Sequence, residues 1–295
     1  MNAPAEELTE LRYWDDHWAA VQLPQEARHQ PGQLYLNEIL RVFDRFLPHD
    51  DRLTALEVGG APGTYLAYVC RSFGYRVACL DYSATGCEAT ERNCKSMGIS
   101  VDVYNADLFD DRVALPQFDV VYSLGLIEHF SDPVPVVARH VRLLKPGGIL
   151  LLGVPNFLGI NLVFLSRLAP GLVAQHELSV MDLRRWETFE ERFNLEVLFK
   201  GYVGGFEPGV FRRREEANRR TAVPYFVARV LSRLLSRHAG MLRRLNSRWW
   251  SGYAMAVYRR PLDQRQGATY DQVLGDIDVD RQATGDAPVA PASAG

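Results

Sequence analysis

Residues 56–66 read LEVGGAPGTYL, an apolar run that ends in a glycine-rich turn and continues into a helical pattern. The apolar run 53–58 predicts a buried strand, and the spacing of apolar residues over 64–73 predicts a helix. Glycines let a backbone turn tightly and approach a ligand closely. Many nucleotide-binding folds open in this way, but the same turn also occurs where a helix simply packs against a strand, so the stretch alone leaves its ligand open.

Strands and helices continue to alternate beyond this stretch. Further strands are predicted at 75–80, 100–104, 118–123 and 149–154, and further helices at 83–97 and 133–144, the last stopped by the turn signal Lys145-Pro146-Gly147-Gly148. Such alternation is typical of a parallel sheet with helices on both faces. Two more strands, 195–202 and 253–258, resemble a hairpin-like pair. The sequence therefore predicts the α/β class, with a Rossmann-like, doubly wound, seven-stranded and mostly parallel sheet.

The same patterns divide the chain into four regions. We expect an N-terminal helical cap at 1–49, the alternating core at 50–155, insertions plus the last two strands at 156–261, and a disordered acidic tail at 262–295. The cap contains two predicted helices, 8–21 and 33–46. The tail is rich in Asp, Gln, Gly, Ala and Pro and has little apolar surface to bury, which is typical of disorder.

The composition is that of an ordinary soluble protein. The chain has 295 residues, 47% of them hydrophobic and 23% charged, with a formal net charge of −3. This charge makes a nucleic acid an unfavoured partner, and no apolar stretch reaches the roughly 18 residues of a membrane span. The N-terminal stretch MNAPAEELTE is acidic and unlike a signal peptide. We therefore expect a cytoplasmic protein.

The cysteines agree with that compartment. Cys70, Cys79, Cys87 and Cys94 form no CxxC pair, and their neighbours supply no histidine at metal-ligand spacing. The sequence predicts free and mostly buried thiols and no metal site.

Polar residues follow the second and third predicted strands. In an open α/β sheet, ligands bind at the carboxyl ends of the strands. Asp81 follows the second strand, where a carboxylate can accept both ribose hydroxyls of a nucleotide, although capping the next helix is its other possible role. Tyr82 can lie against the base. Asp107 and Leu108, after the third strand, can bind an adenine amino group and pack against its ring.

Glu57, just before the glycines, narrows the class of ligand. A dinucleotide places its pyrophosphate at a turn of this kind, and a carboxylate beside it would repel that anion. A ligand with an ammonium or sulfonium group would instead be attracted. S-adenosylmethionine carries both cations and has no phosphate.

Taken together, these motifs resemble those of class I S-adenosylmethionine-dependent methyltransferases, of the branch that acts on small molecules and lipids. LEVGGAPGTYL resembles motif I, acidic-x-Gly-x-Gly-x-Gly, while FDVVYSLGLIEHF and LLKPGGILLLGVPN resemble the fourth-strand and fifth-strand motifs, so that the likeness covers roughly residues 50–156. Ala61 stands where the family usually has its middle glycine, and alanine fits there if its φ stays negative. The resemblance implies a helical cap on the acceptor side and S-adenosyl-L-methionine as cofactor, bound by Glu57, Gly59, Ala61, Gly63, Asp81, Tyr82, Asp107, Leu108 and Ser123.

Glu128 and His129 follow the fourth strand, in a loop that faces the transferred methyl group in this fold. Methyl transfer is an in-line displacement that depends on positioning, and a general base helps when the nucleophile must lose a proton. Histidine titrates near neutral pH. We predict His129 as the general base, with Glu128 orienting it or binding a cationic acceptor. The other interpretation is that the pair stabilises the loop and caps the next helix.

Two further groups allow two interpretations each. His176 lies in the segment after the fifth strand, which usually helps to form the acceptor pocket. It is either a second base or acceptor ligand, or a histidine that only packs or faces solvent. Tyr13, Trp14 and Trp18 form either part of a lid over the cofactor or the core of the N-terminal helix packing.

The second half of the chain is rich in arginine. Residues 212–260 contain thirteen arginines and two glutamates, and Arg229, Arg233 and Arg237 recur every four residues within 223–245. This pattern predicts a basic amphipathic helix, suited to peripheral contact with an anionic membrane surface or to an anionic acceptor. A solvated face over an ordinary cap is the other interpretation.

The predicted function is methyl transfer from S-adenosylmethionine to a small-molecule or lipid-linked acceptor. The acceptor, the methylated atom and the oligomeric state stay open. A nicotinamide-dependent oxidoreductase is the alternative, against which stand Glu57 and the lack of a Tyr-x-x-x-Lys pair in a suitable helix. A non-catalytic cofactor-binding module is another. Nucleic-acid methylation is disfavoured, because the fourth strand ends in Ser-Leu-Gly-Leu and not in an Asn/Asp-Pro-Pro-aromatic run.

Overall fold

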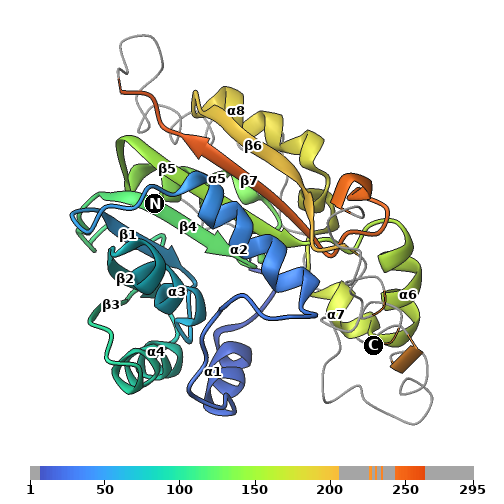
Figure 1. Cartoon of the computed structure of the whole chain (residues 1–295), viewed down its shortest axis with the longest axis horizontal. Coiled ribbons are helices and arrows are strands. Elements are labelled where there is room, and N and C mark those ends of the chain that lie inside the picture. Colours follow the sequence, from blue (N-terminus) through green and yellow to red (C-terminus); the bar gives the residue numbers. More distant parts are fainter. Residues whose placement is uncertain (1–6, 206–225, 228–229, 231–233, 235–242, 263–295) are drawn as a thin grey trace, which may run out of the picture.

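The computed structural model describes residues 7–205, 226–227, 230, 234 and 243–262. These residues contain a seven-stranded sheet with the strand order β3-β2-β1-β4-β5-β7-β6 (Figure 1). The strands are β1 (Thr54–Val58), β2 (Arg76–Asp81), β3 (Val101–Asn105), β4 (Phe118–Leu124), β5 (Leu144–Pro155), β6 (Glu196–Val203) and β7 (Tyr253–Arg259). β7 runs antiparallel between β5 and β6, and the other neighbours are parallel. The predicted α/β class with a Rossmann-like, mostly parallel sheet of seven strands is confirmed.

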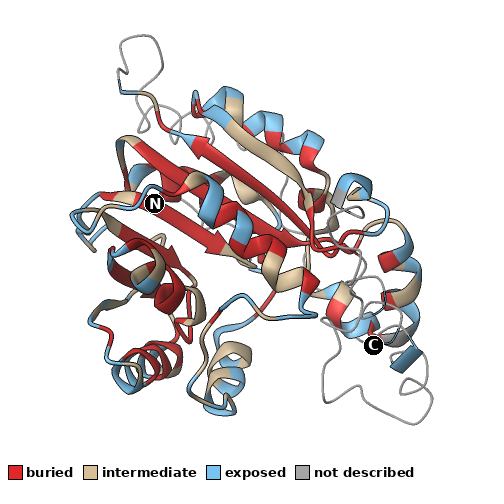
Figure 2. Cartoon of the chain, in the orientation of Figure 1, coloured by how far each residue is buried: buried red, intermediate tan, exposed pale blue. Residues whose placement is uncertain are grey.

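Helices cover both faces of this sheet. The buried residues of α2 (Leu34–Phe46) and α3 (Thr64–Phe73) pack in one core, and those of α5 (Pro133–Arg142) and α8 (Glu187–Arg192) pack in a second core. The central strands β1, β2, β4, β5 and β7 are mostly buried, whereas the edge strands β3 and β6 are for the most part partly exposed (Figure 2). Along β5, Leu150 faces one core and Leu151 the other, as the alternation of a strand requires.

Two helices on the ligand side begin at side-chain caps. Ser83 Oγ accepts the backbone N–H of Gly86 at 2.9 Å and starts α4 (Ala84–Ser96). Asp132 accepts the N–H of Val134 at 3.0 Å and starts α5, whose first residue is a proline. These caps fix the paths of the chain just after β2 and β4.

One boundary prediction was wrong. The sequence 145–148 was expected to form a turn between a helix and a strand, but α5 ends at Arg142 and β5 already begins at Leu144. The register shifts between Phe118 and Val120 of β4, so the glycine-rich residues form an irregularity inside the strand. Gly147, with φ +79°, donates its N–H to the carbonyl of Arg260 at 2.8 Å. This long-range bond from the end of β7 keeps the segment extended.

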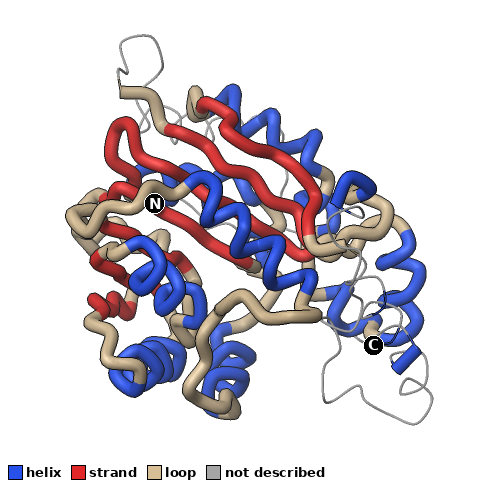
Figure 3. The backbone as a smooth tube through the Cα atoms, viewed as in Figure 1, coloured by secondary structure: helices blue, strands red, loops and turns tan. Residues whose placement is uncertain are grey.

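The segment after β5 forms small helices at the carboxyl end of that strand (Figure 3). They are α6 (Ile160–Leu168), α7 (Pro170–Ala174) and the 3₁₀ turns η2 (Leu178–Met181) and η3 (Leu183–Trp186). Near the N-terminus, α1 (Leu11–Ala19) is shorter than the predicted helix 8–21. The division of the chain into four regions stays a prediction.

Further predictions concern the acidic tail, the basic helix, the cysteines and membrane-spanning segments. The tail 262–295 lies outside the described residues except for Leu262, and of the basic helix 223–245 only residues 226–227, 230, 234 and 243–245 are described. The four cysteines are free thiols, and Cys79, Cys87 and Cys94 are buried, as predicted. Within the described ranges, no helix combines the length and the apolar character needed to cross a membrane.

Candidate active site

A cavity opens at the carboxyl ends of β1, β2 and β4, where the strand order reverses. Its volume is about 850 Å³ when the part open to solvent is included. An open α/β sheet binds its ligands at this place. The wall is formed by residues that follow the strands, together with part of the N-terminal segment: Glu7, Thr9, Trp14, Trp18, Gly59, Ala61, Asp81, Tyr82, Asp107, Leu108, Leu126, His129 and Phe130.

Glycines shape the turn after β1. Gly59 has a φ of +66°, and a Cβ atom there would lie 2.9 Å from Cδ1 of Leu126. A Cβ atom on Gly60 would lie 2.5 Å from Cγ of Glu57. Gly63, with φ +81°, directly precedes α3. The backbone can therefore pass over Glu57 and beside Leu126 only because side chains are missing here.

Asp81 ends β2 and faces this turn. Its Oδ1 accepts the N–H of Ser83 at 2.9 Å, and its Oδ2 accepts the N–H of Ala61 at 3.4 Å. The residue is 6% exposed, and burial raises the pKa of its carboxyl to about 6. Ala61 keeps a negative φ, the condition under which alanine can replace glycine at this position. A carboxylate held in this way retains lone pairs for the hydroxyls of a ligand.

Glu57 lies beneath the glycine turn and does not line the cavity. Tyr122 donates its hydroxyl hydrogen to Oε2 of Glu57 at 3.2 Å. The side chain is buried, and desolvation raises the pKa of its carboxyl to about 8. A largely protonated carboxyl below the turn supports the loop. Its predicted attraction for a cationic ligand stays a prediction.

Tyr82, Asp107 and Leu108 line another side of the cavity. Asp107 Oδ1 accepts the N–H of Phe109 at 2.8 Å and fixes the turn after β3. Glu7 of the N-terminal segment joins this wall, where burial raises the pKa of its carboxyl. The wall therefore combines apolar surface with acceptor oxygens, which suits a heteroaromatic ring that carries an amino group.

Two tryptophans of α1 line the cavity. Trp14 and Trp18 lie one helical turn apart, and their rings are stacked with centroids 6.1 Å apart. The ring of Trp14 meets that of His129 edge-on at 5.0 Å. No residue of α1 is buried, and Tyr13 is not part of the cavity wall. Trp14 and Trp18 thus line the cavity, as the lid interpretation requires, and Trp18 also packs against Gly86 of α4, so both interpretations stay predictions.

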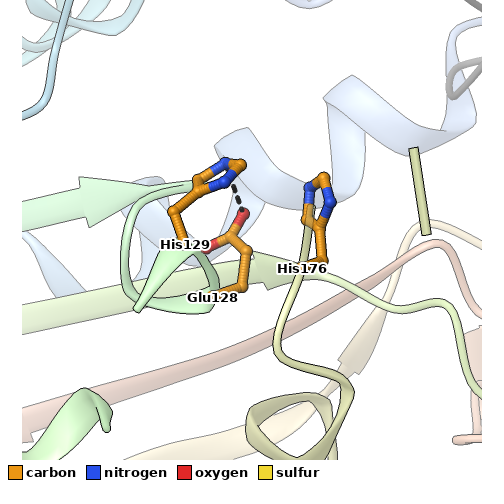
Figure 4. Close-up of side chains that lie close together, drawn as sticks. All are labelled: Glu128, His129 and His176. Atoms are coloured by element: carbon orange, nitrogen blue, oxygen red, sulfur yellow. Dashed lines mark ion pairs between the residues drawn. The ribbon is translucent and has the colours of Figure 1, made fainter. Parts of the chain in front are cut away.

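Beside the cavity, Glu128, His129 and His176 converge (Figure 4). Glu128 and His129 belong to η1 (Ile127–His129), and His176 follows α7. The N–H of Glu177 donates to the carbonyl of Glu128 at 2.7 Å and ties the two segments together. The two imidazole centroids lie 4.6 Å apart, and Oε1 of Glu128 lies 4.0 Å from Nε2 of His129.

The three side chains differ in their surroundings. Nδ1 of His129 lies 3.1 Å from the carbonyl of Gln175 and 3.1 Å from Oγ1 of Thr9. Glu128 is fully buried, and desolvation raises the pKa of its carboxyl to about 8. His176 is half-buried, with its ring 4.8 Å from that of Phe157. It is therefore no free surface histidine.

The predicted cofactor residues divide into two groups. Gly59, Ala61, Asp81, Tyr82, Asp107 and Leu108 line the cavity. Outside its wall lie Glu57 below the turn, Gly63 before α3 and Ser123 within β4.

The sequence reasoning missed Glu7, Thr9 and Leu126. Leu8 N–H donates to the carbonyl of His129 at 2.8 Å and so brings Glu7 and Thr9 to the cavity. Nothing in the local sequence pattern signals that pairing. Leu126 follows Gly125, whose φ of +81° marks the turn after β4, and that glycine was the available signal.

Comparisons with known proteins agree with this geometry. Residues 56–152 match the family model of a methyltransferase domain. A ubiquinone biosynthesis O-methyltransferase of Thiobacillus denitrificans is 36% identical over 90 residues, which cover 30% of this chain and 39% of that protein. One from Serratia proteamaculans is 29% identical over 147 residues, which cover 48% of this chain and 55% of that protein. The chain thus spans roughly half or less of the length of these curated relatives.

A solved structure extends the likeness of the fold over most of the chain. The geranyl diphosphate C-methyltransferase of Streptomyces coelicolor A3(2), in complex with Mg²⁺, geranyl-S-thiolodiphosphate and S-adenosyl-L-homocysteine, superposes with a TM-score of 0.54. The match covers 88% of this chain and 100% of that chain at 13% sequence identity. The fold is therefore that of a class I methyltransferase.

Proposed function

We propose that this chain, whose residues 56–152 match the model of a methyltransferase domain, transfers a methyl group from S-adenosylmethionine to a small molecule. The placement of Asp81 carries the proposal. Its buried carboxyl ends β2, lines the cavity and reaches the N–H of Ala61 across the glycine turn. This is where a carboxylate binds the ribose of an adenine nucleoside in such a sheet.

The residues of the cavity fit the proposed cofactor. Asp81 would accept the ribose hydroxyls, and Asp107 would accept the adenine amino group. Tyr82 and Leu108 would pack against the adenine, while the turn at Gly59 lets the backbone approach the remainder of the molecule. When bound, S-adenosylmethionine supplies a methyl group on a positively charged sulfur, which a nucleophile can displace in line.

His129 is the proposed proton acceptor of the reaction. Its ring lies in the cavity wall, and its Nδ1 is 3.1 Å from the carbonyl of Gln175. Because a carbonyl oxygen only accepts, Nδ1 carries the hydrogen in that contact and Nε2 has the lone pair. Glu128, whose Oε1 lies 4.0 Å from Nε2, would offset the positive charge that His129 gains once the carboxyl has lost its own proton. General-base assistance of this kind is worth roughly 10²–10⁴-fold in rate.

The proposed acceptor is bulky and partly apolar, and a lipid-linked molecule belongs to this class. Phe130 lines the cavity, and Phe157 lies beside His176 at a centroid distance of 4.8 Å. These aromatic rings favour an acceptor with apolar surface over a small polar one. The curated relatives, named O-methyltransferases of ubiquinone biosynthesis, support the same class.

Calorimetric titration of the purified protein with S-adenosylmethionine, S-adenosylhomocysteine and NADH tests the cofactor. We expect binding of both sulfur ligands and none of NADH. Binding of NADH alone would support the oxidoreductase alternative and overturn the proposal. Transfer of labelled methyl groups into a panel of phenolic and lipid-linked acceptors then separates an enzyme from a module that only binds the cofactor.

A further inference from the structure

Glu128, His129 and His176 form a cluster that the proposed methyl transfer uses only in part. Each offers one ligand atom, a ring nitrogen or a carboxylate oxygen, and these atoms all lie within 4.8 Å of one another (Figure 4). Two imidazoles and one carboxylate are a ligand set that proteins use for zinc and related transition metals.

The two imidazole rings are held in a way that suits metal binding. Nδ1 of His129 lies 3.1 Å from the carbonyl of Gln175, and Nδ1 of His176 lies 2.7 Å from the carbonyl of Leu172. Both Nδ1 atoms carry their hydrogen in these contacts, so that the lone pair of each ring is on Nε2. Hydrogen bonds from the other ring nitrogen to backbone carbonyls are what fix the tautomer of metal-binding histidines.

Glu128 gives a second and independent indication. The residue is 1% exposed, and its Oε2 has no hydrogen-bond partner among the described residues. Its Oε1 lies 4.0 Å from Nε2 of His129, too far for a hydrogen bond. A carboxylate buried with so few partners is costly, and a cation between it and the two rings would remove that cost.

We propose that Glu128, His129 and His176 bind one divalent transition-metal cation, of which Zn²⁺ is the reference case, beside the cofactor cavity. Three protein ligands leave a position open for water or for an oxygen of a small molecule, as in catalytic zinc sites. This site departs from the sequence expectation of no metal, because that expectation considered only short spacings around the cysteines.

The role of such a cation rests on the proposed function, whereas its binding does not. A cation at this place stabilises the deprotonated form of an acceptor hydroxyl, whose proton passes to solvent. Nε2 of His129 can hold a proton or a metal but not both. The metal-loaded protein therefore activates the acceptor through the cation, and the metal-free protein activates it through His129.

The test uses the full chain, stripped with EDTA and dialysed, with no cofactor or acceptor present. Titration with ZnCl₂ alone in a calorimeter should show one ion bound per chain. His176→Ala and Glu128→Gln should each weaken this binding at least about tenfold. His49→Ala removes an exposed histidine from another part of the chain, serves as the matched control, and should bind Zn²⁺ like the wild type.

Thermal unfolding by circular dichroism guards against misfolded variants. All four proteins should unfold at similar temperatures without metal, and Zn²⁺ should raise the midpoint only for the wild type and His49→Ala. If a cluster variant does not fold, His176→Asn replaces it in the same comparison. Absence of Zn²⁺ binding by the wild type, or equal affinity in all variants, would overturn the metal site. Because S-adenosylmethionine takes no part, that outcome leaves the proposed methyl transfer standing.

Discussion

A Cβ atom on Gly86 would lie 2.9 Å from the Cβ atom of Ala61 and 2.8 Å from Cδ1 of Trp18. Gly86 belongs to the first turn of α4, where its N–H donates to Ser83 Oγ. The helix thus presents bare backbone both to the turn after β1 and to the lid. The family resemblance places a glycine at 61, and this chain instead has an alanine there and a glycine opposite it. The space for Ala61 is therefore provided by Gly86.

We expect Gly86→Ala to weaken cofactor binding more than it destabilises the fold. The added methyl group must push away either Ala61 or Trp18, and overpacking of this kind costs about 1–3 kcal/mol. The affinity for S-adenosylmethionine, measured by calorimetry, should fall about fivefold or more. Glu88→Ala on the exposed side of the same helix is the control and should bind normally. Normal binding by Gly86→Ala as well would show that the contact is of no consequence.

Asp81→Ala tests the ribose assignment. The change removes the buried carboxylate that the ribose hydroxyls would use, while the backbone of β2 keeps its pairing with β1 and β3. We expect affinity for S-adenosylmethionine to fall at least about tenfold, since hydrogen bonds to a charged group contribute about 1.5–3 kcal/mol each. Circular dichroism should show a folded protein. An unchanged dissociation constant would disprove the assignment.

Cofactor binding should depend on pH through the same carboxyl. Burial raises the pKa of Asp81 to about 6, so the proton that weakens its acceptor role is bound below that pH. We expect the affinity for S-adenosylmethionine to fall about tenfold between pH 7.5 and pH 5. At a pH one unit below its pKa, a carboxyl group is about nine-tenths protonated. Asp81→Asn should bind weakly and independently of pH over this range. A wild-type profile as flat as that of the variant would contradict the prediction.

The raised pKa also predicts that Asp81 lowers stability at neutral pH. An acid whose folded-state pKa is raised favours the folded state fully only below its usual value of 3.8, and this contribution is lost as pH rises through about 6. Asp81→Asn should therefore unfold at a higher temperature than the wild type at pH 7.5. Its free energy of unfolding should be larger by an amount on the order of 1–3 kcal/mol. Near pH 4 the gain should vanish. A lower melting temperature at pH 7.5 would mean that the hydrogen bonds of the carboxylate outweigh its desolvation.

His129→Ala should leave the cofactor affinity intact and slow turnover by roughly 10²–10⁴-fold. The ring lies in the cavity wall but contributes no proposed contact to the ribose or the adenine. The measurement is kcat with an acceptor identified by the labelling screen. Wild-type turnover would reject both the proton-acceptor role and a role as an essential metal ligand. The Zn²⁺ titration distinguishes these two roles.

The lid can be followed through its tryptophans. Trp14 and Trp18 line the cavity, and a bound ligand should change their fluorescence. Trp18→Phe should reduce the change that S-adenosylmethionine produces, while Trp249→Phe, at a side chain that is 62% exposed, should preserve it. Equal signals from both variants would mean that Trp18 does not sense the ligand.

Patterns within short windows predicted most of the sheet. The strands β1, β4 and β5 are apolar because both of their faces are covered by helices. Such apolar runs can be recognised directly in the sequence. The position of Asp81 could also be predicted from the strand pattern, since the carboxyl ends of the central strands form the ligand-binding edge of such a sheet. The turn signal at 145–148 was misleading because a contact outside its own short window decides the conformation there. Its local preference is overridden by the bond from Gly147 to Arg260, which lies far along the chain.

The cluster around His129 could be predicted only in part. Glu128 and His129 are adjacent and follow a recognisable strand, but His176 reaches them through the paths of α6 and α7. No spacing rule connects positions on either side of two such helices. Thr9 reaches the same histidine, with Oγ1 3.1 Å from Nδ1, because the N-terminal segment pairs with the η1 loop. Contacts of this kind depend on the assembled fold.

The position of β7 also affects how the protein is made. During translation β5 and β6 leave the ribosome before β7, yet β7 must enter between them. Until Tyr253–Arg259 emerges, β5 lacks a neighbour on one edge and β6 has no described strand to pair with. Open edges of this kind invite association with other chains. The nascent chain is therefore most exposed to such association until Tyr253–Arg259 has emerged and paired with both neighbouring strands.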